Sequence, residues 1–137
     1  MTEATTEPCA DVCAAIPITE LPAIGALLRG GTYAGAISQP DGALVAVVLL
    51  PGVGENLTWA KAKAWAKKQG GELPSRPVAA LLYASVKAQL RPRRHWTSEA
   101  HDASYAWLCN FIDGYQYIGD VGFEACAVAV RLIPIKG

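Results

Sequence analysis

The sequence predicts a single α+β domain, and three observations lead to this fold class. Two strand-like segments separated by a turn predict a β-hairpin over residues 32–50. Two amphipathic segments then predict helices, one over residues 59–69 and one that begins after Ser75. After residue 95 only strand and loop patterns remain. The expected order is therefore a hairpin, two helices and a small twisted antiparallel sheet with long loops.

The composition is that of one folded domain. The chain has 137 residues, 52% of them hydrophobic and 18% charged, which excludes an intrinsically disordered protein. Twelve basic and twelve acidic residues cancel, so no nucleic-acid partner is expected. The longest apolar run, residues 43–50, is too short to span a bilayer, so no membrane insertion is expected. We expect residues 1–15 to form a flexible arm without a secretory signal and 16–137 to form the domain.

Turn and capping residues set the limits of the predicted elements. In the hairpin turn Gln39-Pro40-Asp41-Gly42, proline fixes the first corner and glycine takes the positive φ. Thr58 is the expected N-cap of the first helix, which ends at Gly70-Gly71. Ser75 is the expected N-cap of the second helix, with Pro77 in its first turn.

The last third of the chain carries the strongest indication of function. Strand-like segments at 105–111 and 127–133 bracket residues 113–123, which mix aromatic and aliphatic residues with glycines and aspartates. This pattern is typical of a recognition loop displayed on a rigid frame. Alternation in 105–111 predicts that the face bearing Trp107 is buried and that Leu108 and Asn110 point outward.

Several segments together resemble a family of phage and bacterial domains with a C-type-lectin-like fold, also found at the tips of collagen-like adhesins. They are Leu57–Ala66, Gly70–Arg76, Ala80–Tyr83, His95–Ser98 and Ala129–Arg131. The resemblance covers about residues 20–135 and implies a C-type-lectin-like fold for the domain.

The resemblance extends to tropism-determining phage proteins, some of which are diversified by retroelements at chosen C-terminal positions. It implies frame positions at Trp107, Phe111, Gly114, Gln116 and Glu124. The candidate ligand-binding positions are the variable-type residues around them: Leu108, Asn110, Ile112, Asp113, Tyr115, Tyr117, Ile118, Gly119, Asp120, Gly122 and Phe123. The chain departs from the commonest family pattern at Cys109, Cys126 and Val128, so no role is carried over to these three.

The resemblance implies a non-catalytic ligand-binding module of phage or prophage origin. Its partner would be a protein or glycan surface, its location a virion surface or the host cytoplasm, and it would need no cofactor. A second hypothesis is a virion structural or assembly protein that uses the same surface as an interface in a homo-oligomer.

No metal site is expected. Cys9 and Cys13 lack the spacing of a zinc pair, and Asp113, Asp120 and Glu124 lack the alternating oxygen ligands of a calcium loop. The triplet at 39–41 is one that sugar-binding lectins use for calcium, but a turn is the favoured interpretation here. The basic cluster of Arg91, Arg93, Arg94 and His95 is interpreted as a solvated helix end rather than a phosphate or nucleic-acid site.

Two enzyme alternatives are weaker. His101, Asp102 and Ser104 are near neighbours without the signature of a nucleophile elbow, which favours a polar turn over a hydrolase site. Formylglycine-generating oxidases have a related fold and use two cysteines, for which Cys109 and Cys126 would be the counterparts. The chain is much shorter than those enzymes, so no catalysis is expected.

Overall fold

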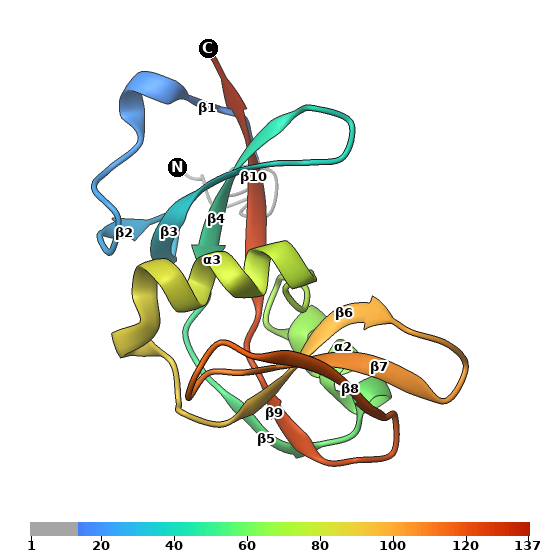
Figure 1. The fold of residues 1–137 in the computed structure, drawn as a ribbon. Coiled ribbons are helices and arrows are strands. Elements are labelled where there is room, and N and C mark those ends of the chain that lie inside the picture. Colours follow the sequence, from blue (N-terminus) through green and yellow to red (C-terminus); the bar gives the residue numbers. More distant parts are fainter. Residues whose placement is uncertain (1–13) are drawn as a thin grey trace.

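The computed structural model describes residues 14–137, which form an α+β protein with two α-helices and two mixed five-stranded sheets (Figure 1). The predicted arm at 1–15 lies almost entirely outside the described residues, as do Cys9 and Cys13. No helix within 14–137 has the length and apolar character to cross a membrane.

The first sheet has the strand order β1-β10-β4-β3-β2. Its strands are β1 (Ile16–Pro17), β2 (Leu27–Leu28), β3 (Gly31–Ser38), β4 (Leu44–Leu49) and β10 (Val130–Lys136). Strand β10 lies between β1, to which it is parallel, and β4, to which it is antiparallel. The first and last described strands are therefore neighbours.

Strands β3 and β4 form the predicted hairpin. Its turn has the predicted chemistry: Gly42 has a φ of 89°, and the Asp41 carboxylate accepts a hydrogen bond of 2.9 Å from the Ala43 amide. Only glycine adopts such a φ without strain, which explains why the chain reverses at this position.

Both predicted helices are confirmed. Helix α2 spans Trp59–Lys68 and is followed, after its C-cap Gln69, by Gly70, whose φ is 90°. Helix α3 spans Arg76–Val86 and continues into the 3₁₀ turn η3 (Lys87–Gln89); a second 3₁₀ turn, η2, spans Ile18–Glu20. The Ser75 hydroxyl accepts a hydrogen bond of 3.3 Å from the Val78 amide, whereas Thr58 makes no side-chain cap.

The second sheet has the strand order β5-β9-β6-β7-β8 and contains every strand of the C-terminal third except β10. Its strands are β5 (Gly54–Leu57), β6 (Arg94–Ala100), β7 (Tyr105–Asn110), β8 (Gln116–Asp120) and β9 (Ala125–Ala127). The prediction of an antiparallel sheet is wrong at one place, because β6 and β9 pair in parallel through His95 and Cys126.

The predicted loop at 113–123 contains a strand at its centre, β8. Strand β8 pairs with β7 in antiparallel register, with Leu108 opposite Tyr117 and Trp107 opposite Ile118. It forms one edge of the second sheet, as Figure 1 shows. Only the turns before and after β8 are irregular, so the region is a β-hairpin with two turns rather than a long loop.

The prediction that Leu108 faces outward is wrong, since its side chain is 1% exposed. Leu108 packs in a hydrophobic cluster with Ala62 of α2, whereas Cys109, on the other face of β7, packs in a second cluster with Leu82 of α3. Both faces of β7 are therefore covered, and alternation alone could not tell which face is buried. Trp107, on the face expected to form the core, is only half-buried.

Candidate ligand-binding site

Most of the predicted binding residues are accessible at the β7–β8 end of the second sheet. Tyr115 is 68% exposed and Ile112 59% exposed, and Phe123 and Ile118 are also exposed. Asp113, Asp120 and Gly122 are also exposed, whereas Asn110, Tyr117 and Gly119 are half-buried. Leu108, which is buried, is not available to a ligand in this structure.

The alternation of β8 divides the candidates between two faces of the sheet. Tyr117 and Gly119 lie on the side of Leu108, whereas Ile118 and Asp120 lie on the side of Trp107. The rings of Tyr115 and Tyr117 are stacked, with centroids 6.0 Å apart and an interplanar angle of 23°. The predicted residues are thus brought close together but do not form one flat contact surface.

The three polar candidates stabilise the turns around β8. The Asn110 side-chain oxygen accepts from the Ile112 amide at 3.0 Å, and the Asp113 carboxylate accepts from the Tyr115 amide at 2.9 Å. The Asp120 carboxylate accepts from the Gly122 amide at 2.7 Å. These bonds are of the Asx-turn kind, in which a side chain caps the backbone two residues on, so each residue fixes the exposed side chains beside it.

Two glycines of this region are restricted by close packing. A Cβ at Gly119 would meet the Leu108 Cδ1 atom at 2.5 Å, and Leu108 is itself buried. A Cβ at Gly114 would meet the Tyr83 ring at 2.8 Å, and Gly114 has a φ of 81°. Both positions are therefore closely constrained, and Gly119 does not have open surroundings.

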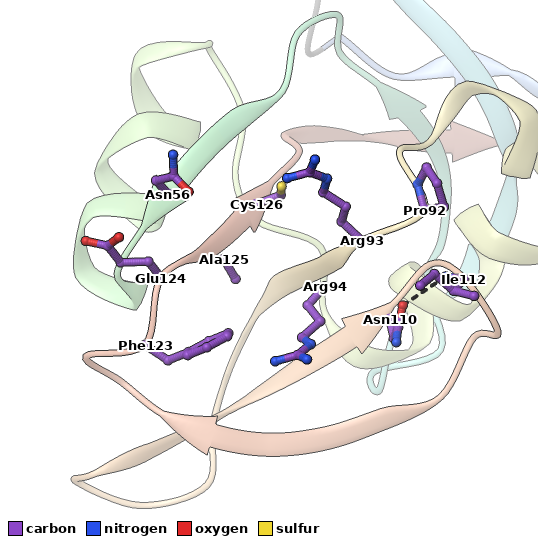
Figure 2. Close-up of a pocket in the computed structure, with 10 residues that line it drawn as sticks. All are labelled: Asn56, Pro92, Arg93, Arg94, Asn110, Ile112, Phe123, Glu124, Ala125 and Cys126. Atoms are coloured by element: carbon purple, nitrogen blue, oxygen red, sulfur yellow. Dashed lines mark hydrogen bonds between the residues drawn. The ribbon is translucent and has the colours of Figure 1, made fainter.

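A pocket of about 320 Å³ lies beside the hairpin, where the start of β6, the end of β7 and the start of β9 meet (Figure 2). Its lining consists of Asn56, Pro92, Arg93, Arg94, Asn110, Ile112, Phe123, Glu124, Ala125 and Cys126. Arg94 and Asn110 are cross-strand partners on the face of the sheet that carries Leu108 and Tyr117. Burial raises the pKa of Tyr117, and the Arg94 guanidinium partly offsets that increase, which places Arg94 near this tyrosine.

Arg93 and Arg94 are functional candidates that the sequence interpretation missed. The signal was the basic cluster at 91–95, which was assigned to a helix end; α3 instead ends at Val86, and Arg94 begins β6. Arg91 forms an ion pair with Glu55, whereas within residues 14–137 neither Arg93 nor Arg94 has an acidic partner. The Arg94 guanidinium lies 5.3 Å from the centre of the Phe123 ring.

On the opposite face, Arg76 at the start of α3 connects the helix to the hairpin. Its guanidinium lies 3.6 Å from the centre of the Trp107 ring. Its Nε donates to the Gln116 side-chain oxygen at 2.9 Å, and the Gln116 amide nitrogen donates to the Arg76 carbonyl at 2.9 Å. This reciprocal pair holds the first residue of β8 against α3, so the base of the hairpin is anchored while its turns stay exposed.

Cys109 and Cys126 flank His95 on the two strands next to β6, and both are free and buried. Burial raises the pKa of the Cys109 thiol to about 11 and also raises that of Cys126. At neutral pH both thiols are therefore protonated, and the thiol form is a poor nucleophile and a poor metal ligand. No three His, Cys, Asp or Glu side chains within the described part of the chain gather in a way that could hold a metal ion.

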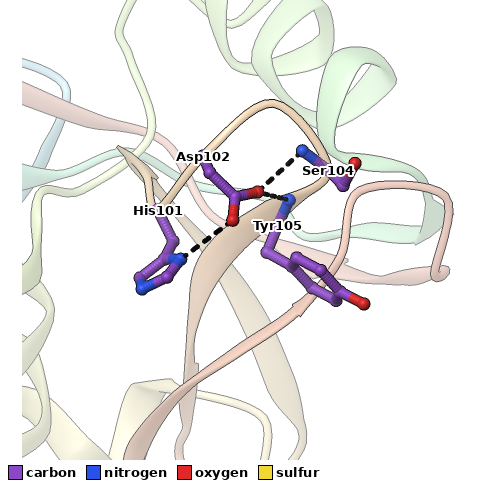
Figure 3. A network of polar contacts seen from close by, with 4 residues as sticks. All are labelled: His101, Asp102, Ser104 and Tyr105. Atoms are coloured by element: carbon purple, nitrogen blue, oxygen red, sulfur yellow. Dashed lines mark hydrogen bonds and ion pairs between the residues drawn. The ribbon is translucent and has the colours of Figure 1, made fainter.

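His101 and Asp102 belong to an exposed turn between β6 and β7 (Figure 3). The Asp102 carboxylate accepts from the backbone amides of Ser104 and Tyr105 at 2.8 and 2.9 Å, and His101 Nδ1 lies 3.3 Å from its other oxygen. These interactions, the Ser104 amide first, lower the pKa of Asp102. Ser104 contributes its backbone amide and not its hydroxyl to the network, so the three residues form a capped turn.

Comparison with models of known protein families and with curated proteins finds no match for this chain. The functional evidence therefore lies in the site's own residues. These are an exposed aromatic and aliphatic group on the turns around β8, and a pocket with two arginines beside it.

Proposed function

We propose that this protein is a non-catalytic ligand-binding module that presents the surface around β8 to a protein or glycan partner. The observation that carries the proposal is the concentration of exposed large apolar side chains in residues 112–123, where Ile112, Tyr115, Ile118 and Phe123 are accessible. A cluster of exposed apolar side chains is typical of an interaction site, because single exposed apolar residues are common on protein surfaces and clusters of them are not.

The rigid support of these side chains favours binding over a purely structural role. Turn caps at Asn110 and Asp113 hold the backbone on both sides of Ile112, and the Arg76–Gln116 pair fixes the base of β8. A ligand that meets such a surface orders fewer side chains than one that meets a mobile loop, so less affinity is lost to conformational entropy.

The proposal also includes a C-type-lectin-like fold and a phage or prophage origin. Two helices, two sheets and the neighbouring strands β1 and β10 are compatible with that fold. Within the proposal, Ile112, Tyr115 and Phe123 are open enough to be varied by a retroelement, whereas Leu108 and Gly119 are constrained by their contact. A near-copy of the segment coding for residues 105–131 beside a reverse transcriptase gene would support this origin.

Tyr115→Ala should weaken capture of the partner by a free energy on the order of 1–4 kcal/mol, because large aromatic side chains carry most of the energy of such surfaces. Tyr115 is 68% exposed, so the substitution should leave folding intact. The measurement is the dissociation constant for a partner selected from surface-displayed host proteins or a glycan array.

The matched control is Tyr105→Ala. Tyr105 is a tyrosine of the same hairpin, 41% exposed, but it lies opposite Asp120 at the far end of β8. The control should bind as the wild type does. Equal affinity of the wild type and the Tyr115 variant would contradict the proposal.

The free edge of β8 favours one second candidate, an assembly protein that uses this surface between copies of itself. An edge strand presents unpaired backbone groups that can template pairing with another chain. Size-exclusion chromatography with light scattering separates the two functions when it compares the wild type with a Tyr115/Tyr117/Phe123 triple alanine variant. The variant should have a lower oligomeric state than the wild type only if this surface joins copies of the chain.

A further inference from the structure

We propose that the pocket in Figure 2 is a subsite for an anionic group, a carboxylate or a phosphate, attached to an apolar or aromatic body. The inference rests on the proposed ligand-binding function and names the chemistry that this part of the site selects. Four features carry it: the size of the pocket, its charge, its hydrogen-bond donors and its apolar walls.

The size of the pocket suits one chemical group rather than a flat protein surface. Its volume is about 320 Å³, at the lower end of the range of roughly 300–1,000 Å³ that small-molecule sites occupy. A group the size of one sugar acid or one aromatic acid fits, and the rest of a larger ligand would extend across the exposed turns beside it.

The charge of the lining is positive and is not neutralised within the described residues. Arg93 and Arg94 contribute two guanidinium groups and Glu124 one carboxylate, and no ion pair joins Glu124 to either arginine. Figure 2 shows the Glu124 side chain directed away from Arg94. Figure 2 also shows the Arg93 guanidinium beside Cys126 and the Arg94 guanidinium pointing the opposite way, on the side of Phe123. An anion entering on that side would therefore meet the available Arg94 guanidinium instead of displacing an existing partner.

The donors are arranged to bind a planar or tetrahedral anion. A guanidinium presents a fork of N–H groups that matches carboxylate and phosphate oxygens in pairs. The Arg94 guanidinium lies over the ring of Phe123, 5.3 Å from its centre. Asn110 uses its side-chain oxygen to cap the Ile112 amide, which directs its amide nitrogen elsewhere as a further donor beside Arg94.

The apolar walls of the pocket suit the apolar or aromatic body of the proposed ligand. Ile112 and Phe123 are 59% and 40% exposed and stand at opposite sides of the opening in Figure 2. A bare inorganic anion would leave both side chains in water, whereas an anion with an apolar or aromatic body would cover them. The expected ligand group is therefore amphipathic and not a free ion.

The test is isothermal titration of the full chain, combined with amide chemical-shift mapping, with four probes: phenylacetate, phenyl phosphate, neutral phenylacetamide and inorganic phosphate. At least one aromatic anion should bind ten times or more tighter than the amide and than inorganic phosphate. The preferred aromatic anion then identifies the group as carboxylate or phosphate. Shifts should concentrate at residues 93–94, 110–112 and 123–126.

Arg94→Gln should reduce the affinity for the preferred anion at least tenfold without changing the affinity for the amide. Arg94→Lys should restore only part of it, because lysine keeps the charge but loses the paired donors. Lys68→Gln, which removes the same charge from an exposed position on α2 outside the pocket, should bind as the wild type does. Equal thermal unfolding of the three variants and the wild type confirms that the fold is kept.

The inference is overturned if the amide binds as tightly as the anions, if Arg94→Gln has no effect, or if the shifts map elsewhere. Its failure is distinguishable from that of the proposed function. Loss of partner capture in Tyr115→Ala with no anion binding would retain the function and reject the subsite. Anion binding lost in Arg94→Gln, with partner capture unaffected by Tyr115→Ala, would retain the subsite and reject the surface around β8.

Discussion

His95 is the residue whose chemistry is most altered by the fold. Its Nδ1 lies 2.8 Å from the Arg93 carbonyl and must donate to it, since a carbonyl only accepts. Its Nε2 therefore holds a lone pair, and this buried atom has no hydrogen-bond partner among residues 14–137. Burial is the main cause that lowers the pKa of His95 from 6.5 to about 4, because a cation would be poorly solvated at this position.

The stability of the protein should therefore fall as the pH decreases from 6.5 toward 4. In this range the unfolded chain takes up a proton on His95 and the folded protein does not, so protonation favours unfolding. Below the folded pKa the full loss of folding stability is on the order of 3 kcal/mol. Above the unfolded pKa no stability is lost. Denaturant unfolding of the wild type and of His95→Asn across pH 4–7 measures it. If the two proteins show parallel pH profiles, His95 is not the group responsible.

Single residues also show where sequence reasoning succeeded and where it could not. Ile112 and Tyr115 are exposed, as expected for two of the variable positions that the family resemblance implies. The burial of Leu108 does not follow from the sequence, because β7 packs into a hydrophobic cluster on each of its two faces and has no polar face to set the parity. Arg94 was missed because the point where α3 ends, and hence the place of the basic cluster, depends on tertiary packing.

Among the elements, the two helices differ in how they begin. The Ser75 hydroxyl accepts from the Val78 amide and satisfies one of the free donors of α3, whereas Thr58 makes no such bond at α2. At the start of α2 the Trp59 amide instead donates a hydrogen bond of 3.1 Å to the Val121 carbonyl.

Ser75→Ala should therefore destabilise the protein by about 1 kcal/mol, the usual cost of removing a cap. Thr58→Ala should cost clearly less, since no cap bond is lost. Both values follow from urea unfolding at neutral pH. A larger cost at Thr58 than at Ser75 would show that the hydroxyl of Thr58 has a role that this structure does not contain.

The elements that the sequence predicted well are those with local signals. The hairpin β3–β4 has a turn whose residues define it, α2 has a glycine stop at Gly70, and α3 has a serine cap at Ser75. Strand β8 was predicted as a loop because its sequence contains glycine and aspartate, which are rare in strands. Pairing with β7 and packing of Gly119 against Leu108 outweigh that local preference, and neither is visible in the segment itself.

At the scale of the molecule, the two sheets share their hydrophobic interior. One cluster joins Ala46 and Val48 of the first sheet to Trp96 and Leu108 of the second, and the other joins Val47 to Phe111. Neither sheet can lose its partner without exposing part of both clusters, so the described residues should unfold as one cooperative unit.

This cooperativity can be tested because all four tryptophans belong to the half that contains α2, β6 and β7. Tryptophan fluorescence therefore reports on that half, whereas far-ultraviolet circular dichroism reports on both. The two signals should give the same urea midpoint and the same slope. A fluorescence transition that precedes the dichroism transition would mean that the second sheet unfolds independently.

The central place of β10 also has a consequence for biosynthesis. This strand is translated after every other described strand, yet it lies between β1 and β4. While the ribosome is still short of residue 130, the β4 edge is unpaired and can associate with another nascent chain. The first sheet can thus be completed only once translation has passed residue 136, and a chain released before that point would be a substrate for chaperones and proteases.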